Sequence, residues 1–239
     1  MDFKLYNQAV VGGVITNEPG LRPYEFTVGR SQKVRMLGVG SVIRMDPGNG
    51  KTVYSNISFP SSFTRHAGKS FVRGGNVLIN GKLDSWVKEE EDRINLSIKL
   101  HASQGTTVKA DGVLCTNSPI FSNNIAIAGV VRTPGMREPS THFEEEGQTL
   151  FYLANSLQNE GTDREKTVWA PVLLKDVPDG FGEDEDAVWT VQGRLTGVQF
   201  EGDNWQDCIA VDNIVASGTL DEVAGCMVPF EEITGDIPF

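Results

Sequence analysis

The chain has 239 residues, of which 39% are hydrophobic and 22% charged. At about 150 residues per domain this length predicts one or two domains, and the composition is that of a protein that buries a core. No apolar run approaches the roughly 18 residues of a membrane-spanning helix, and the first residues lack the basic and apolar regions of a signal peptide. Cys115, Cys208 and Cys226 are odd in number and show no C-x-x-C spacing, which argues against a disulfide framework and a zinc site. We therefore expect a reducing, cytoplasmic compartment.

Charge is distributed unevenly along the chain. The net charge of −11 argues against a nucleic-acid partner, because an acidic surface repels phosphates. However, residues 1–110 contain 15 Lys and Arg against 9 Asp and Glu, whereas residues 111–239 contain 6 against 23. A basic half joined to an acidic half indicates a polyanionic partner for one end only.

Short apolar, β-branched stretches closed by Gly, Pro, Asn or Asp run through the first half and predict strands. They are Ala9–Thr16, Tyr24–Val28, Val34–Ile43, Val53–Phe59, Asn76–Val87 and Ile94–Leu100. One segment, Ser61–Phe71, is compatible with a helix, because it follows Pro60 and opens with two serines that can cap it. About five strands with one short helix between the third and the fourth are typical of a small Greek-key barrel, the OB-fold.

The second half repeats the first in the same order. Ala9–Ile15 is echoed by Ile125–Val131, Phe26–Val28 by Phe151–Leu153, Lys51–Tyr54 by Lys166–Trp169, Asn80–Leu83 by Gln192–Leu195, and Ala102–Ser103 by Ala216–Ser217. The offsets lie between 112 and 125 residues, and loops absorb differences of this size. We therefore expect an all-β chain of two tandem OB-folds. The expected parts are a basic barrel over 1–108, a linker over 109–119, an acidic barrel over 120–217, and a flexible acidic tail over 218–239.

Two motifs that resemble catalytic sites do not support an enzyme. The stretch before Lys51 and Thr52 resembles a P-loop, but Met45 stands where that motif needs its first glycine, and the second copy has no glycine beside Lys166. The acidic run Gly182–Asp186 has consecutive carboxylates, which rarely converge on one ion. His66, His101 and His142 lie in unrelated segments. We expect no catalytic residues, no metal and no cofactor.

Aromatic and basic residues are interleaved in the first half. Flat side chains that stack on bases, with cations along the phosphates, are how proteins hold single-stranded nucleic acid. We expect Tyr54 and Trp86 to be exposed, because one begins a strand beside polar residues and the other lies near a hairpin turn; Phe59 has the alternative of filling the core. The expected DNA-binding residues are Lys33, Arg35, Lys51, Tyr54, Phe59, Arg73, Lys82, Trp86, Lys88 and, in the second half, Trp169 and Arg194.

The C-terminus reads Gly-Asp-Ile-Pro-Phe after an acidic stretch. A terminal aromatic residue has no fold to join there, but a partner can capture its ring and the terminal carboxylate together. This tip, with Tyr54 in Lys-Thr-Val-Tyr and Trp86 after Asn-Gly-Lys-Leu-Asp-Ser, resembles the bacterial-type single-stranded DNA-binding proteins. The resemblance is to their tandem form, in which two chains supply four OB-folds. It implies base stacking by Tyr54 and Trp86, with Trp169 at the matching position of the second copy, and a partner-binding tail made of Asp236, Ile237, Pro238 and Phe239.

The chain departs from that family in three ways. A long Gly/Pro/Gln-rich linker before the tip is missing, a single acid (Asp236) adjoins Ile-Pro-Phe, and the second barrel is too acidic to be an obvious DNA binder. These departures are compatible with a phage- or plasmid-borne relative.

The function expected from the sequence is non-specific binding of single-stranded DNA in replication, recombination or repair, without chemistry. We further expect a homodimer and recruitment of replication or repair proteins through the tip, with no membrane partner. The alternative is an OB-fold accessory factor that mainly holds other proteins and has little DNA affinity of its own.

Overall fold

The computed structural model describes residues 5–17, 20–28, 31–39, 43–45, 52–60, 72–88, 93–99, 113–134, 147–158, 165–199 and 205–226. The first half contains β1 (Asn7–Ile15), β2 (Gly20–Val28), β3 (Ser31–Val39), β4 (Ile43–Met45), β5 (Val53–Pro60), β6 (Asn76–Lys88) and β7 (Arg93–Lys99). The second half contains β8 (Val113–Thr116), β9 (Ser122–Val131), β10 (Thr149–Gln158), β11 (Glu165–Leu174), β12 (Ala187–Gln199), β13 (Trp205–Thr219) and α2 (Leu220–Cys226). The expected helix over Ser61–Phe71 lies outside the described residues.

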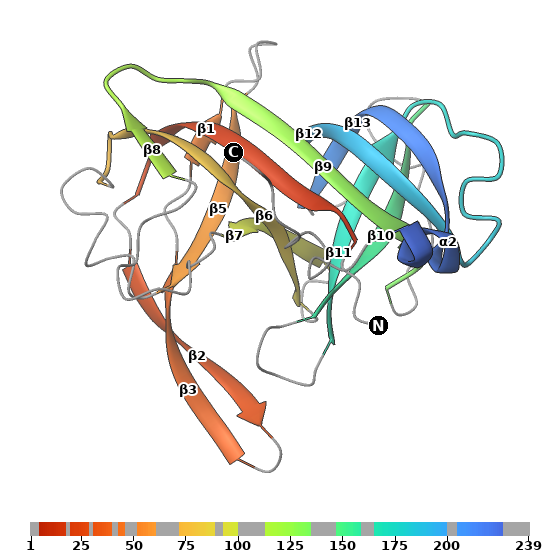
Figure 1. Ribbon diagram of the computed structural model, residues 1–239. Coiled ribbons are helices and arrows are strands. Elements are labelled where there is room, and N and C mark those ends of the chain that lie inside the picture. Colours follow the sequence, from red (N-terminus) through yellow and green to blue (C-terminus); the bar gives the residue numbers. More distant parts are fainter. Residues whose placement is uncertain are drawn as a thin grey trace, which may run out of the picture.

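Each half closes its strands into a barrel. In the first barrel the order is β1-β4-β5-β7-β6, and β6 pairs back to β1. In the second the order is β9-β10-β11-β13-β12, and β12 pairs back to β9. The third and fifth strands of each barrel are parallel, with Ile57 opposite Ile98 and Val172 opposite Ile209. This order and these parallel pairs confirm the expected all-β chain of two OB-folds, which lie side by side (Figure 1).

Alternating apolar side chains fill both barrels. Along β1, the side chains of Ala9, Val11 and Ile15 are fully or almost fully buried. Along β9, Ile125 and Ile127 are buried in the same way. Because side chains of a strand alternate between its faces, the intervening residues lie on the outer surface of each barrel. The alternation that predicted these strands therefore also predicts which side chains reach the outer surface.

The strands β1 and β9 join the two barrels into one sheet. They pair antiparallel from Asn7 opposite Ile127 to Gly12 opposite Ser122. Within this ladder, Ala9 lies opposite Ile125, the residue that matches it in the sequence repeat. An approximate two-fold axis therefore passes through this pair and relates the barrels, as a true two-fold relates identical subunits. Figure 1 shows the two strands running together between the barrels.

A pair of buried asparagines follows the same symmetry. The Asn7 side chain donates to the carbonyl of Leu83 (2.9 Å) and accepts from its N–H (2.8 Å). The Asn123 side chain makes the same two bonds with Leu195, also at 2.9 and 2.8 Å. Both asparagines are 7% exposed. Buried amides that satisfy both their donor and acceptor groups fix strand register, so this device pins the first strand of each barrel to its fourth.

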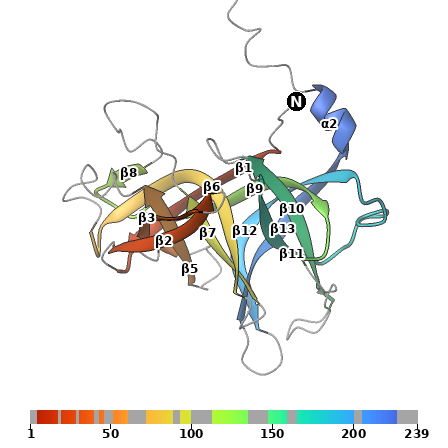
Figure 2. The same cartoon turned by 90° about the horizontal axis from the view of Figure 1, so that it is seen from below.

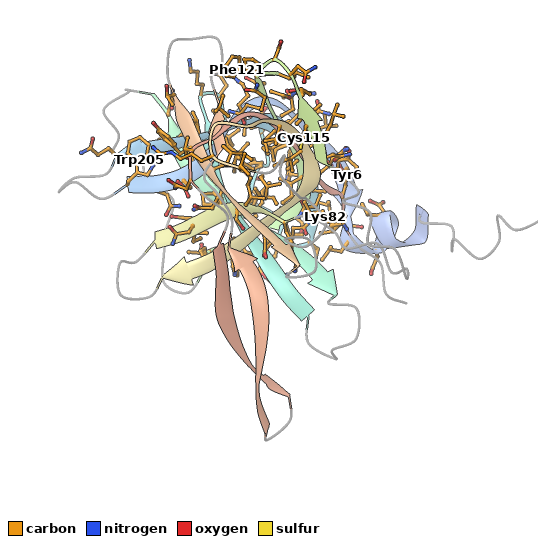
Figure 3. All side chains as sticks on the ribbon, turned by 90° about the vertical axis from the view of Figure 1, so that its left-hand side faces the viewer. Tyr6, Lys82, Cys115, Phe121 and Trp205 are labelled. Atoms are coloured by element: carbon orange, nitrogen blue, oxygen red, sulfur yellow. The ribbon has the colours of Figure 1, made fainter. Side chains whose placement is uncertain are left out.

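The first barrel carries a hairpin that the second lacks among the described residues. Strand β2 pairs β3 along its whole length, while only the end of β3 (Leu37–Val39) pairs β5. The hairpin stands away from the barrel in Figures 1 and 3. The strand that corresponds to β10 is β4 rather than β2, so the sequence match of Phe26–Val28 with Phe151–Leu153 is wrong. That match failed because both segments alternate, and alternation does not specify the pairing partner.

The second barrel closes one end with an aromatic side chain. Between β11 and β12, residues 175–186 form turns, and Phe181 from this segment is 6% exposed. Its ring lies edge-on to Phe151 (centroids 5.0 Å apart) and to Trp189 (5.1 Å). The acidic run Gly182–Asp186 follows directly and is exposed, as expected for a solvated loop.

Regular structure extends into both segments expected to be linker or tail. Strand β8 pairs β6. The chain then crosses the outer face of β1, since a Cβ atom on Gly12 would come within 2.2 Å of the carbonyl oxygen of Ile120. After β13, the Thr219 and Glu222 side chains cap α2 reciprocally, with bonds of 2.8 and 3.3 Å to each other's N–H groups. Leu220 and Val223 of α2 pack on a small apolar cluster that includes Ala128, Val130 and Val188.

The helix α2 lies at the edge of the second barrel (Figure 2). Its seven residues are too few to cross a bilayer, and no helix in the described part of the chain is long and apolar enough to do so.

Candidate nucleic-acid interface

Tyr54 is presented on the outer surface of the first barrel. It lies on β5 between half-buried Val53 and buried Ser55, and its side chain is 59% exposed. Its cross-strand neighbour on β4 is Arg44. A largely exposed aromatic ring on a rigid strand, beside a strand that carries a cation, is the arrangement that base stacking needs.

The β6–β7 hairpin carries the other predicted aromatic residue of this barrel. The register places Trp86 opposite Asn95, Lys88 opposite Arg93, and Lys82 opposite Lys99. Strand β7 lies between β5 and β6 and pairs β5 at Asn56–Ser58, so β5 and β6 are about 10 Å apart there at the usual strand spacing. Two cross-strand pairs of basic residues and one tryptophan therefore lie on strands of the sheet that Tyr54 occupies.

The remaining predicted residues of the first barrel are spread over neighbouring elements. Lys33 and Arg35 lie on β3 of the protruding hairpin, opposite Phe26 and Tyr24. Phe59 lies on β5 opposite Gly38 of β3, which connects the hairpin to the strand of Tyr54. Arg73 is exposed in the turn before β6, and Lys82 is half-buried (Figure 3). Lys51 and the tip Asp236–Phe239 lie outside the described residues, as do the side chains of Lys33, Arg35, Phe59, Trp86 and Lys88.

The matching residues of the second barrel are arranged differently. Trp169 is half-buried and packs against both apolar clusters, and its backbone N–H donates to the hydroxyl of Ser85 (2.8 Å). Arg194 is held by the Asp212 carboxylate through Nε (3.0 Å) and Nη2 (2.9 Å). In such a bidentate pair, the carboxylate already neutralises the positive charge of the guanidinium. The second barrel therefore offers little stacking surface at Trp169 and little positive charge at Arg194.

Trp205 is an exposed aromatic residue that the sequence analysis did not select. It begins β13 at the end of the β12–β13 hairpin and is 50% exposed (Figure 3). Its indole lies over Gly197, where a Cβ atom would come within 2.2 Å of its Nε1. The signal in the sequence is a tryptophan directly after the polar stretch Glu201–Asn204. The acidic residues of that stretch, and Asp207 after it, oppose a phosphate backbone.

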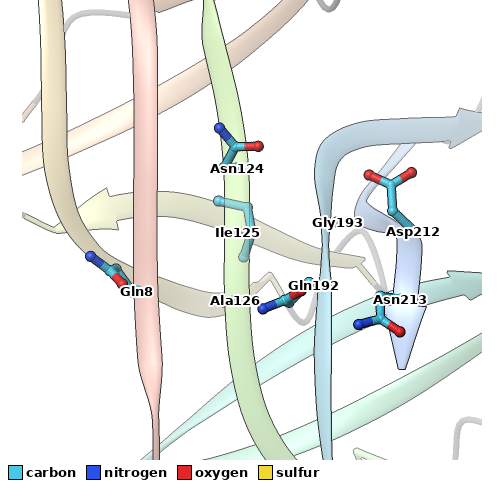
Figure 4. A pocket seen from close by; sticks show the side chains of 8 residues that line it. All are labelled: Gln8, Asn124, Ile125, Ala126, Gln192, Gly193, Asp212 and Asn213. Carbon is cyan, nitrogen blue, oxygen red and sulfur yellow. The ribbon is translucent and has the colours of Figure 1, made fainter. Parts of the chain in front are cut away.

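A polar hollow of about 350 Å³ lies on the outer face of the shared sheet (Figure 4). Its lining comprises Gln8, Asn124, Ile125, Ala126, Gln192, Gly193, Asp212 and Asn213. The amide of Gln8 also approaches Asn80 of β6 (3.4 Å). Carboxamides donate and accept hydrogen bonds but do not titrate. The one carboxylate in this lining, Asp212, is bonded by the Arg194 guanidinium (2.9 Å), so the hollow offers mainly hydrogen bonding.

Among the residues that the structure describes, the titratable groups that could support chemistry are not assembled into a centre. Burial, with the neighbouring charge of Asp207, raises the pKa of the Cys208 thiol far above its usual range, so this thiol stays protonated. Burial also raises the pKa of Cys115. Within the described ranges, no group of three or more His, Cys, Asp or Glu side chains could hold a metal ion.

Comparison with solved structures identifies the fold. The wild-type single-stranded DNA-binding protein of Thermus aquaticus matches with a TM-score of 0.51 and 15% identity, covering 90% of this chain and 94% of that one. A deletion variant of the same protein matches with a TM-score of 0.51 and 16% identity, covering 89% and 95%. This chain has the fold of that single-stranded DNA-binding protein. No protein-family model and no curated protein matches the chain.

The fold match confirms the expected resemblance in fold to the tandem single-stranded DNA-binding proteins. It spans both barrels, so it agrees with the two OB-folds found in the strand order. At this identity it shows the architecture alone, and the chemistry of the surface has to be argued from this chain's own residues. On that surface, the first barrel exposes Tyr54 and the second barrel covers Trp169.

The difference between Tyr54 and Trp169 gives a test of the interface. Tyr54→Ala is expected to weaken binding of a dT oligonucleotide by about 1–3 kcal/mol, the loss of one stacked base, and Trp86→Ala by a similar amount. Trp169→Ala should weaken binding less. Fluorescence anisotropy of a labelled oligonucleotide measures all three.

Tyr6→Ala is the matched control, because Tyr6 is 50% exposed just before β1 and its backbone carbonyl accepts hydrogen bonds from Ala128 and Asn155 of the second barrel. The control should bind as the unaltered chain does. Losses that are equal at Tyr6 and Tyr54, or larger at Trp169, would contradict this placement of the interface.

Proposed function

We propose that this chain binds single-stranded DNA without sequence preference, in the cytoplasm, during replication, recombination or repair. The observation that carries the proposal is Tyr54, an aromatic ring 59% exposed on a strand of the basic OB-fold. The fold match to a single-stranded DNA-binding protein supports it. Binding combines stacking on Tyr54 and Trp86 with phosphate contacts by the cations of β3 and the β6–β7 hairpin, and it involves no chemistry.

The charge distribution favours the first barrel as the site. Residues 1–110 hold 15 basic and 9 acidic residues, whereas residues 111–217 hold 6 and 18. Phosphates are attracted to the first half and repelled by the second. The alternative, an accessory factor that holds proteins, needs neither an exposed tyrosine nor facing cations on neighbouring strands.

Salt dependence distinguishes these two functions. Affinity for dT oligonucleotides should fall by about 0.7 log units per decade of salt for each phosphate that is neutralised. Lys88→Ala, which removes one phosphate contact, should make this salt dependence shallower by about 0.7 log units per decade. Lys175→Ala is the control, because Lys175 is exposed on the acidic loop of the second barrel. A flat salt response of the unaltered chain would support the accessory-factor function instead.

We propose that Asp236–Phe239 recruits replication or repair proteins. The support is the sequence of the tip: the aromatic ring of Phe239 can be captured in an apolar pocket of a partner, and Asp236 adds steering charge.

Deletion of the tip tests this role. Removing Asp236–Phe239 should abolish co-purification of replication or repair proteins from the native host, while affinity for dT stays the same or rises slightly. Phe239→Leu is the milder control, because it keeps an apolar end and should retain part of the recruitment. Unchanged partners after the deletion, or a clear loss of DNA binding, would overturn the assignment.

We further propose a homodimer in which the second barrel contributes more contacts than the first. The polar hollow supports this, because most of its lining comes from β9, β12 and β13. Asn124, Gln192 and Asn213 carry both donors and acceptors, so they can pair with their own copies across a two-fold axis.

Light scattering measures the assembly. The expected mass is twice the 26.1 kDa of one chain. Gln192→Glu should shift the assembly toward the single chain, because it sets like charges facing each other across the axis. A single chain at micromolar concentration would rule out the homodimer.

A further inference from the structure

Part of β7 has an edge that no backbone strand covers in the described structure. On one side, β6 pairs β7 from Arg93 to Lys99. On the other side, β5 pairs only Ser97 and its neighbours toward the end of the strand. The beginning of β7, around Ile94, therefore presents N–H and C=O groups that no strand pairs on that side, and such edges need a partner when they are buried.

The second barrel supplies this partner through side chains. The Gln206 carboxamide donates to the carbonyl of Ile94 (2.6 Å) and accepts from its N–H (3.1 Å), so it replaces one rung of a strand. The Asp207 carboxylate accepts from the N–H of Leu96 (3.2 Å). Gln206 is 1% exposed and Ile94 also 1%, so water does not compete for these bonds.

The other strand of the hairpin is tied to the second barrel as well. The Ser85 hydroxyl on β6 accepts from the backbone N–H of Trp169 on β11 (2.8 Å), and Ser85 is 3% exposed. Ser85 directly precedes Trp86, and Ile94 and Leu96 flank Asn95, the cross-strand neighbour of Trp86. The contacts made by Gln206, Asp207 and the backbone of Trp169 therefore lie on residues next to the cross-strand pair of Trp86 and Asn95.

We propose that Gln206 and Asp207 are positioning residues that hold Trp86 of the first barrel ready for a base, an inference that rests on the proposed function. A hairpin end with an unpaired edge samples several conformations, and ordering it on binding costs affinity. Gln206 and Asp207 order it before DNA arrives. The acidic second barrel thus contributes to DNA binding by ordering the backbone of the first barrel, without contacting the DNA itself.

A double-mutant cycle in the full chain tests this. Gln206→Ala should weaken dT binding about threefold to tenfold in the unaltered chain and by less than about twofold in a chain that already carries Trp86→Ala. The backbone N–H groups of Ile94 and Leu96 should exchange with solvent faster in Gln206→Ala without DNA. The matched control is Asn123→Ala, which also removes two buried amide bonds but within the second barrel. It should lower thermal stability and leave dT binding unchanged.

Asp207 gives an independent variant in case Gln206→Ala does not fold. Asp207→Ala should behave as Gln206→Ala does, whereas Asp207→Asn keeps an acceptor oxygen for Leu96 and should restore binding. Equal losses with and without the Trp86→Ala substitution, or no loss in either background, would overturn the inference alone. Failure of the unaltered chain to bind dT would overturn the proposed function itself, and with it the inference.

Discussion

The backbone pairing of β1 with β9 is the constraint on which the rest of the molecule depends. Because Ala9 and Ile125 match in the repeat and also face each other in the ladder, the two barrels are related by an approximate two-fold axis. This pairing fixes their relative orientation. The same arrangement sets the β6–β7 hairpin of the first barrel against β11 and β13 of the second, where Ser85, Gln206 and Asp207 make their contacts.

A symmetric backbone carries asymmetric surface chemistry. Tyr54 and Trp169 occupy equivalent positions, but one ring is exposed and the other is packed against the core. Lys82 matches Arg194, whose guanidinium is neutralised by Asp212. After a duplication, one copy can keep the fold without keeping the same surface. Here the second barrel has the same fold as the first, but its acidic surface disfavours phosphates. In our account it supports the first barrel mechanically.

The sequence predicted both barrels, because alternation and a repeat at nearly constant spacing are local patterns. It also predicted the exposure of Tyr54 from its polar neighbours. It missed the structural role of Asn7 and Asn123, because their partners are more than seventy residues away. The match of Phe26–Val28 with Phe151–Leu153 failed for the same reason: pairing depends on neighbours in space. The pairing of Arg194 with Asp212, and of Gln206 with Ile94, likewise required the register of β13.

The central claim is that one barrel receives the DNA strand while the other supports it. Hydrogen exchange of the full chain, with and without a dT oligonucleotide, tests this most directly because it reports on both barrels in one sample. The account predicts added protection in β5 and in the β6–β7 hairpin, with β11 and β12 unchanged. Equal protection of both barrels, or protection confined to the second, would contradict it.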